Sequence, residues 1–487
     1  MEREKPWLHK TVKKNAIATV LSILCVYVFY AMNSGITITN DGSHFALFDS
    51  LVTTGSPELK QVRQFAFGDS AEYNGKFYSD RNPGLALFTV AFYQGAQPLE
   101  KWMKALRLDP GFARNYTEGQ RSRISLVMLV PAVSGGLVLL FTFFLARQMG
   151  VALWASILAS LSILFGTIML RYSTVFYSHS FSAALLVCSL WLIFSYRKQG
   201  SLAALFVGVF CFSFAVLAEH LLVVVFLPVL VYLLVLKPRD LFRFSSLLGV
   251  VVAGLMPMSV LMMYNWVCFD SPFVLAHFHH SHDTANHEIT TLLRLDQSLG
   301  VAGNLLFGAP ESEVGRKDLV GLFSASPFLY SLALFPLLVA KRYSKFTAEH
   351  AVLAVSVILL MLGASSVWEP YGGWDRDYRY FVVAVPLLAP FVGAVLDFLL
   401  HAAPGVFYRS IKYLAILAFF GLCYISVKNQ LAHVRHELQV QPPHLLINYD
   451  SSLVNVSLLL GFLIACAVVL LFLYKAVFNR ARSEVLE

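Results

Sequence analysis

The chain has 487 residues, of which 57% are hydrophobic and 14% are charged, and its formal net charge is +8. Soluble domains carry about 25% charged residues, so this composition excludes a soluble globular protein. Apolar runs long enough to cross a bilayer as helices recur along the whole chain. Most basic side chains stand in the short connections between these runs, where they set the orientation of the spans, so the positive charge does not indicate nucleic-acid binding. The predicted class is an all-α polytopic membrane protein with no large soluble domain.

The first predicted element is a transmembrane helix over residues 15–36. It follows a basic segment, residues 1–14, which the positive-inside rule places in the cytoplasm. No small-residue cleavage site follows this helix, so the pattern indicates an uncleaved signal anchor. The chain is therefore expected to reach the outside at residue 37 and to begin there its first outer loop, residues 37–123.

Eleven further spans are predicted from apolar runs with basic flanks. They cover residues 124–146, 151–171, 176–196, 202–218, 221–236, 245–267, 326–340, 349–367, 379–400, 410–427 and 453–476. The basic clusters then fall on the inner side together with both termini, which gives about twelve transmembrane helices. The longer outer connections are residues 268–325 and 428–452. The whole chain, residues 1–487, is predicted to form a single membrane domain.

Residues 83–106 are apolar but begin with Pro83 and Gly84, and the apolar part is short. If this segment crossed the membrane, every later basic cluster would fall on the outer side. We therefore predict a juxtamembrane helix that lies at the outer surface.

The polar residues of interest fall on the predicted outer side. A transporter more often places ionisable groups near the middle of its spans. The spans of this chain are largely uncharged, which disfavours a flippase or a transporter. The main exception is Glu219–His220, which we expect to be a hydrogen-bonded buried pair at an outer span edge. One-sided polarity indicates chemistry or binding at the outer face.

Six sequence blocks carry a family resemblance. They are NDGSHFALFDSLVTTGS (40–56), FYSDRNPGLALFTVAFY (77–93), RISLVMLVPAVSGGLVLLFTFFLARQMG (123–150), MMYNWVCFDSPF (262–273), GLFSASPFLYSLALFPLL (321–338) and GGWDRDYRYFVVAVPLLAPF (372–391). Their order and spacing resemble the C-type (GT-C) glycosyltransferases, the integral-membrane superfamily that includes protein O-mannosyltransferases and the aminoarabinose transferase of lipid A. The resemblance implies a GT-C-like fold and an inverting transfer of a sugar from a polyprenyl-phosphate donor to a lipid, glycan or protein acceptor. It also implies a bacterial cytoplasmic membrane, with the active site on its periplasmic face.

The residues of the outer loops suit this chemistry. An acceptor hydroxyl must lose a proton as it attacks the anomeric carbon, and Asp41 is the candidate base. Arg forks match phosphate oxygens, so Arg81 and Arg379 are the candidate donor-phosphate ligands. Other candidates for the donor and acceptor site are His44, Asp49, Tyr78, His179, Asp375, Asp377 and Tyr380. Asp41–Gly42 is equally the pattern of an ordinary turn, and the two arginines are equally typical of the membrane interface.

This sequence departs from the family pattern in the second outer loop, where His179 stands in place of an acid. The departure leaves open a second hypothesis, a catalytically inactive GT-C-like structural or assembly subunit of a membrane complex. No soluble outer domain is expected after residues 453–476, so acceptor recognition would come from membrane loops or from a partner protein.

A His-rich stretch, residues 277–288, offers possible metal ligands. His279, His280 and His282 are weak candidates for Zn²⁺, because imidazole is an apt ligand but the spacing is irregular. A divalent metal is therefore possible but not favoured, and no cofactor is expected. We expect this loop to order over the donor or the acceptor.

Overall fold

The computed structural model describes residues 6–33, 35–36, 40–66, 68–105, 117–236, 241–280, 296–310, 319–340, 346–367, 370–371, 378–401 and 406–440. Within these residues the chain is almost entirely helical, and its one sheet is a two-stranded antiparallel hairpin, so the predicted all-α class is confirmed. The elements are α1 (Pro6–Ala31), α2 (Asn40–Thr54), α3 (Arg63–Ala66), β1 (Ser70–Tyr73), β2 (Lys76–Ser79), α4 (Gly84–Ala105), α5 (Glu118–Val127), α6 (Leu129–Gln148), α7 (Leu153–Phe165), α8 (Met169–Tyr172), α9 (Ser178–Gln199), α10 (Leu202–Ala218), η1 (His220–Val225), α11 (Phe226–Leu236), α13 (Phe244–Phe269), η2 (Ala276–His279), α15 (Ser298–Phe307), α17 (Leu322–Ala325), η3 (Pro327–Leu334), α18 (Phe335–Ala340), α19 (Ala348–Ser366), η4 (Arg379–Leu388), α20 (Ala389–His401) and α21 (Val406–Val440), where η marks 3₁₀ segments.

Six of the described helical segments are long and apolar enough to cross a membrane. They are Gly119–Gln148, Ser178–Gln199, Phe244–Phe269, Ala348–Ser366, Arg379–His401 and Lys412–Ala432. The shorter apolar segments are Ala16–Ala31, Leu153–Phe165, Leu202–Ala218, His220–Val235, Ser298–Phe307 and Pro327–Ala340. Every predicted span within the described residues coincides with one of these segments, and the span predicted over residues 453–476 lies outside them. The chain is an integral membrane protein.

The alternative of an ordinary turn at Asp41–Gly42 is wrong. Asn40–Thr54 forms helix α2, and Gly42 lies in its first turn. The chain turns earlier, at Gly35, whose φ of 70° falls in the left-handed region that favours glycine. The polar residues of this stretch are therefore held by a helix rather than by a loop.

Two other predicted outer loops contain helix. The connection predicted over residues 268–325 includes α15. The loop predicted over residues 428–452 begins inside α21, which continues to Val440. α15 lies apart from the apolar runs that set the predicted spans. α21 instead continues beyond the apolar run of the span predicted over residues 410–427.

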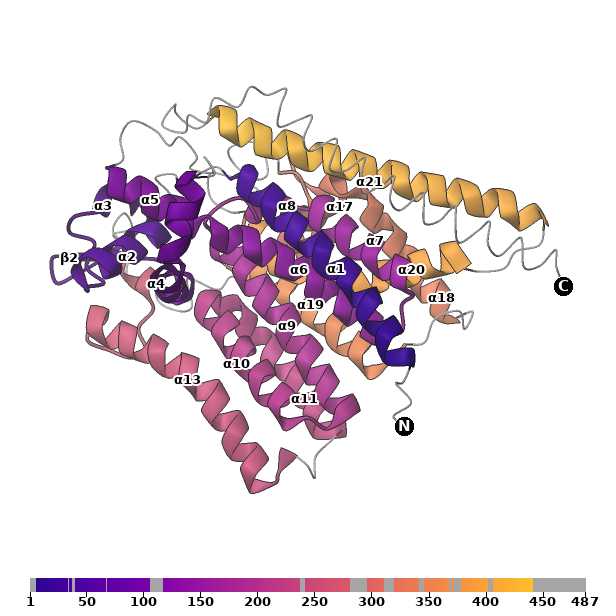
Figure 1. Ribbon diagram of the computed structural model, residues 1–487, viewed down its shortest axis with the longest axis horizontal. Helices are drawn as coiled ribbons and strands as arrows, with labels where there is room; N and C mark the ends of the chain where they lie inside the picture. The colour runs from indigo at the N-terminus through magenta and orange to yellow at the C-terminus, as the bar shows by residue number, and fades with distance from the viewer. Residues whose placement is uncertain are drawn as a thin grey trace.

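The long helices run side by side across the body of the molecule (Figure 1). α1 packs on α6, α6 on α9, and α9 on α10. Two glycines of α6 allow the close approach to α1. A Cβ on Gly135 would lie 2.7 Å from the ring of Phe29, and one on Gly136 would lie 2.8 Å from the carbonyl oxygen of Ser22. Small residues are typical of such contacts, because van der Waals packing holds helices together in lipid.

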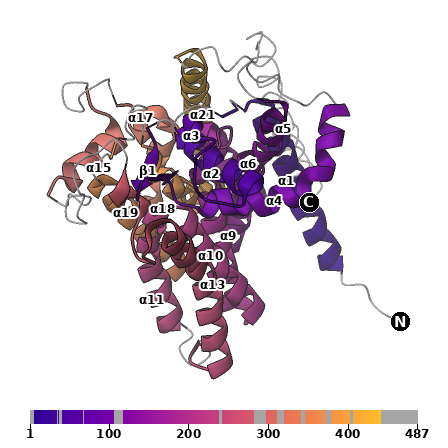
Figure 2. The same ribbon diagram turned by 90° about the vertical axis from the view of Figure 1, so that its left-hand side faces the viewer.

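The elements of the first outer segment gather at one end of the bundle. α2, α3, α4 and the hairpin lie together there (Figure 1), and Figure 2 looks onto this end. We call it the α2 end. At the margins of the bundle, α13 packs on α10 and α21 packs on η3.

Polar contacts fasten the helices at the opposite end. The last turn of α9 holds Arg197, whose Nη1 lies 2.5 Å from Glu349 Oε1 of α19. Tyr232 donates a hydrogen bond to the same oxygen at 2.9 Å. The carboxylate of Asp397 in α20 accepts a hydrogen bond from the backbone N–H of Ala152 at 3.2 Å. The end of α9 thus meets the start of α19, and the end of α20 meets the start of α7. These ends and starts all belong to connections that the sequence places on the inner side of the membrane.

The start of α4 is pressed against the end of α10. Asn82 Nδ2 donates to the carbonyl oxygen of Ala218 at 3.4 Å, and a Cβ on Gly84 would lie 2.6 Å from the backbone nitrogen of Ala218. Since a real Cβ does not approach a backbone atom so closely, the contact requires glycine. α4 is not among the described helices that are long and apolar enough to cross a membrane. Its place at the outer surface stays a prediction.

We expect Gly84→Ala to lower the apparent melting temperature of the detergent-purified protein, because overpacking costs about 1–3 kcal/mol. Gly95→Ala is the matched control in the same helix, since nothing lies within 4 Å of a Cβ at that position. It should leave the melting temperature unchanged or raise it, because alanine is favoured over glycine in a helix by about 0.5–1 kcal/mol. Equal melting temperatures for the two variants would contradict the close packing of α4 on α10.

Candidate active site

A buried ion-pair cluster joins the hairpin to the rest of the α2 end. Arg81 follows β2, and only 15% of its side chain is exposed. Its Nη2 lies 2.8 Å from Asp69 Oδ2, and its Nε lies 3.3 Å from Asp80 Oδ1. Asp69 precedes β1 and Asp80 follows β2, so the two antiparallel strands bring both carboxylates to the same guanidinium.

The first turn of α2 is tied to this cluster. Ser43 Oγ lies 2.8 Å from Ser79 Oγ, and it also donates to Asp80 Oδ1 at 3.2 Å. The side-chain amide of Asn40 faces Arg81, and with its oxygen on that side it accepts from Arg81 Nε at 3.2 Å. These contacts fix the start of α2, and with it Asp41, against the segment that carries Arg81.

The charges of the cluster shift one another's pKa values. Burial alone would raise the pKa of Asp69, but the Arg81 guanidinium outweighs it and holds this pKa below its usual value. Burial prevails at Asp80, whose pKa is raised despite the same arginine. Burial opposes the charge of Arg81, yet Asp80 and Asp69 together raise its pKa. Asp80 is therefore the carboxyl of the cluster that protonates most readily.

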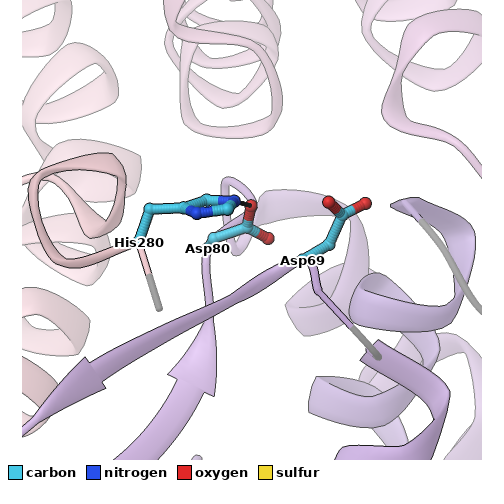
Figure 3. Close-up of side chains that lie close together, drawn as sticks. All are labelled: Asp69, Asp80 and His280. Atoms are coloured by element: carbon cyan, nitrogen blue, oxygen red, sulfur yellow. Dashed lines mark ion pairs between the residues drawn. The ribbon is translucent and has the colours of Figure 1, made fainter. Parts of the chain in front are cut away.

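Figure 3 shows the three side chains that could hold a metal ion, Asp69, Asp80 and His280. Their ligand atoms all lie within 4.8 Å of one another, and His280 Nε2 lies 3.5 Å from Asp80 Oδ2. Carboxylate oxygen and imidazole nitrogen are suitable zinc ligands. Both carboxylates, however, already face the guanidinium of Arg81, so a metal ion would have to compete with a fixed cation.

Of the two metal candidates that lie in the described residues, His279 and His280, His280 alone reaches these carboxylates. His279 stacks on Phe269, with ring centroids 5.2 Å apart, and its ring edge contacts Tyr73. His282 lies outside the described residues. The two aspartates beside His280 were missed by the sequence analysis.

His44 is buried close to the cluster. It lies three residues after Asp41 on α2, and its Nδ1 has no hydrogen-bond partner among the described residues. Its pKa is lowered to about 3, chiefly by burial and then by the charge of Arg81, while Glu219 acts in the opposite direction. His44 is therefore neutral at physiological pH, and it lies within electrostatic range of groups from three other elements.

His179, at the start of α9, pairs with Glu219, at the end of α10. His179 Nδ1 lies 3.0 Å from Glu219 Oε2, and Ser178 Oγ donates to the same oxygen at 3.1 Å. The expected pair Glu219–His220 is thus replaced by a pair between two helices. The His220 ring instead contacts the carbonyl oxygen of Val216 at 3.0 Å.

Aromatic rings and arginines surround His179. Its ring meets Tyr172 edge-on at 4.8 Å and Tyr380 at 6.3 Å. The guanidinium of Arg379 lies over the Tyr380 ring at 5.1 Å, and that of Arg171 lies over the Tyr172 ring at the same distance. Arg379 also acts electrostatically on the Arg81 cluster. Arg171, which is 3% exposed, was not predicted.

Two predicted site residues have structural partners instead. Asp49 of α2 pairs with Arg123 of α5, and burial raises its pKa despite that arginine. Tyr78 of β2 packs edge-on against Phe269, with ring centroids 5.6 Å apart. Asp375 and Asp377 lie outside the described residues.

One missed signal was present in the sequence. Asn74–Gly75 is the preferred pair for a tight hairpin turn, and both residues have positive φ, 52° and 73°. Recognising this hairpin would have placed Asp69 opposite Asp80. Sequence alone gave no signal that Glu219 would meet His179, because the two are 40 positions apart and on different helices.

Comparisons with known proteins find similarity in structure but not in sequence. No family model matches the chain, and no curated protein matches it. ArnT from Cupriavidus metallidurans, solved with bound undecaprenyl phosphate, superposes with a TM-score of 0.51 at 14% identity, over 87% of this chain and 76% of ArnT. The apo oligosaccharyltransferase of Archaeoglobus fulgidus gives a TM-score of 0.51 at 12% identity, over 88% of this chain and 56% of that enzyme.

A further structure of the Archaeoglobus fulgidus enzyme, AglB in complex with an inhibitory peptide and a dolichol-phosphate, gives a TM-score of 0.50 at 12% identity, over 86% of this chain and 56% of AglB. At these identities the likeness concerns the fold. The chain has the fold of the GT-C integral-membrane glycosyltransferases.

Proposed function

We propose that this protein is a glycosyltransferase that moves a sugar from a polyprenyl-phosphate donor to an acceptor at the outer face of the membrane. One observation carries the proposal. The first turn of α2, which holds Asp41, contacts the segment that carries Arg81, and Arg379 acts electrostatically on the same cluster, although the three come from separate segments. The fold supports the lipid-linked donor, since ArnT was solved with undecaprenyl phosphate and AglB with a dolichol-phosphate.

The donor phosphate is proposed to lie between Arg81 and Arg379. The Arg379 guanidinium is proposed to donate N–H bonds to the phosphate oxygens, and Arg81, whose Nε and Nη2 already pair with Asp80 and Asp69, adds positive charge beside them. As the acceptor oxygen attacks the anomeric carbon, the bond from that carbon to the phosphate oxygen breaks, and the electron pair leaves with the lipid phosphate. The two arginines stabilise the negative charge that grows there. Attack opposite the leaving oxygen inverts the anomeric configuration.

Asp41 is proposed to take the proton from the acceptor hydroxyl. Its side chain is buried, and Oδ1 accepts a hydrogen bond from the backbone N–H of Gly42 at 2.9 Å. The carboxylate lies in the first turn of α2, at the N-terminal end of a helix, which attracts negative charge. An ionised, oriented carboxylate is what a general base requires.

The membrane is proposed to be the bacterial cytoplasmic membrane, with the α2 end on the periplasmic side. The acceptor is proposed to be a lipid, a glycan or a protein. Recognition of the acceptor would fall to the loops of the α2 end or to a partner protein.

A second candidate function is a structural or assembly subunit that keeps the fold without the chemistry. The histidine at position 179, where the family resemblance implies an acid, favours it. The two candidates differ in one respect, because only the enzyme needs the carboxylate of Asp41.

We expect Asp41→Asn to lower turnover by about two to four powers of ten, the usual contribution of a positioned base, without loss of expression. Membranes would be supplied in turn with undecaprenyl-phosphate-linked hexose, pentose and amino sugar, and transfer or donor loss would be read by mass spectrometry. Asp49→Asn is the matched control on the same helix. It should lower thermal stability, because it weakens the pair with Arg123, and leave turnover per folded molecule nearly unchanged. Normal turnover by Asp41→Asn would remove Asp41 from catalysis.

Arg379→Ala should weaken the binding of undecaprenyl phosphate by about tenfold or more, since a charge-assisted hydrogen bond contributes about 1.5–3 kcal/mol. Arg379→Lys keeps the charge but not the planar fork, so we expect an intermediate loss. Binding would be measured by native mass spectrometry. Equal affinity in all three proteins would exclude Arg379 as a phosphate ligand.

Chelation should leave the reaction almost unaffected. Because Asp69 and Asp80 already pair with Arg81, we expect EDTA to change turnover by less than about twofold, and added Zn²⁺ not to raise it. A loss of activity in EDTA that Zn²⁺ restores would show that a metal displaces Arg81 from these carboxylates.

A further inference from the structure

We infer that His179 and Glu219 form a coupled pair that recognises a hydroxyl group of the donor sugar. In this pair, His179 makes the contact with the sugar and Glu219 is a positioning residue that acts through it. The inference rests on the proposed function, since it assigns the sugar-binding part of the same site. It concerns two residues from different helices, at the end of α10 and the start of α9.

The geometry of the pair fixes one face of the imidazole. Glu219 Oε2 lies 3.0 Å from His179 Nδ1, and Ser178 Oγ holds the same carboxylate oxygen at 3.1 Å. Both His179 and Glu219 are buried. The Nδ1 atom is at ion-pair distance without being aligned for a full hydrogen bond, and such contacts commonly tighten when substrate binds. A carboxylate on Nδ1 keeps the proton there and leaves Nε2 as an acceptor for a hydroxyl group.

The rings around His179 restrict where it can point. Tyr172 contacts it edge-on at 4.8 Å and Tyr177 at 6.0 Å, while Tyr380 lies at 6.3 Å on another element. Aromatic side chains at a polar group provide apolar faces, which suit the C–H faces of a sugar ring. The imidazole is therefore held on one edge by a carboxylate and framed by three tyrosines.

The pair lies close to the proposed phosphate ligand Arg379. The hydroxyl group that it recognises is therefore inferred to belong to the donor sugar and not to the acceptor. The ring of Tyr380 faces His179, and the guanidinium carbon of Arg379 lies 5.1 Å from the centroid of the same ring. A sugar joined to a phosphate at Arg379 would thus begin one aromatic ring away from His179. A hydroxyl of that sugar is the nearest substrate group that could reach the imidazole.

The charged and titratable groups around the pair come from every packed element. They are His44 on α2, Arg81 after β2, Arg171 and Tyr172 on α8, Tyr177 before α9, His220 on η1, His277 on η2, and Arg379 and Tyr380 on η4. The three arginines carry fixed charges: two carboxylates pair with Arg81, and Arg171 and Arg379 lie over the rings of Tyr172 and Tyr380. Glu219 is thus the carboxylate that faces His179 directly.

The test compares a lipid phosphate with and without its sugar. Undecaprenyl phosphate and the undecaprenyl-phosphate sugar that the wild type binds best, from a panel of hexose, pentose and amino-sugar donors, would be titrated by native mass spectrometry. We expect His179→Ala to bind the sugar-bearing lipid about tenfold more weakly, the effect of one lost hydrogen bond in a buried site. Its affinity for undecaprenyl phosphate should stay within about twofold of wild type.

Two substitutions at Glu219 separate positioning from general stability. Glu219→Gln keeps an acceptor for Nδ1 and should retain most of the preference for the sugar-bearing lipid. Glu219→Leu removes the acceptor at similar size and should lose the preference as His179→Ala does. Glu349→Gln is the matched control, because Glu349 is a buried carboxylate paired with Arg197 at the other end of α9, and it should keep the full preference.

The outcomes distinguish this inference from the proposed function. If the wild type binds neither lipid, the proposed function fails and this inference fails with it. If the wild type prefers the sugar-bearing lipid and His179→Ala or Glu219→Leu keeps that preference, only the sugar-recognising pair is overturned. Equal loss of both lipids in Glu219→Leu, with a lowered melting temperature, would show that Glu219 is merely structural.

Discussion

The α2 end depends on one buried ion-pair cluster, in which the Arg81 guanidinium lies between Asp69 and Asp80. Without this cation two carboxylates, one of them fully buried, would stand close together, which is unfavourable. With it, the hairpin, the first turn of α2 and the start of α4 are joined in one rigid unit. Gly84 then sets that unit directly on the backbone of α10. The cluster therefore determines where Asp41 lies relative to the spans.

The same arrangement explains how a helix bundle with few charges can support polar chemistry at one end. α9 has an ion pair at each end, His179–Glu219 at the α2 end and Arg197–Glu349 at the opposite end. At the opposite end the polar contacts hold neighbouring helices together. At the α2 end they leave two arginines beside aromatic rings, Arg171 and Arg379, in the region where the proposed donor phosphate would meet the protein.

The sequence predicted the all-α membrane class and the apolar helices of the described residues, because these follow from the length of the apolar runs. It also selected Asp41, Arg81 and Arg379, which the structure brings to the same end. It failed where the result depends on contacts between distant segments. The turn expected at Gly42 is helix, since the contacts of Asn40 and Ser43 with the hairpin favour it. Glu219 could not be assigned to His179, because helix packing alone brings the two together.

The central claim is that a lipid phosphate binds between Arg81 and Arg379, with Asp41 beside the sugar that it carries. A cryo-electron microscopy structure of the protein with undecaprenyl phosphate tests this claim most directly. The account predicts phosphate density within hydrogen-bond distance of both guanidinium groups, about 2.7–3.2 Å, at the α2 end. Phosphate density at any other place on the protein, with Arg81 and Arg379 free of ligand, would contradict it.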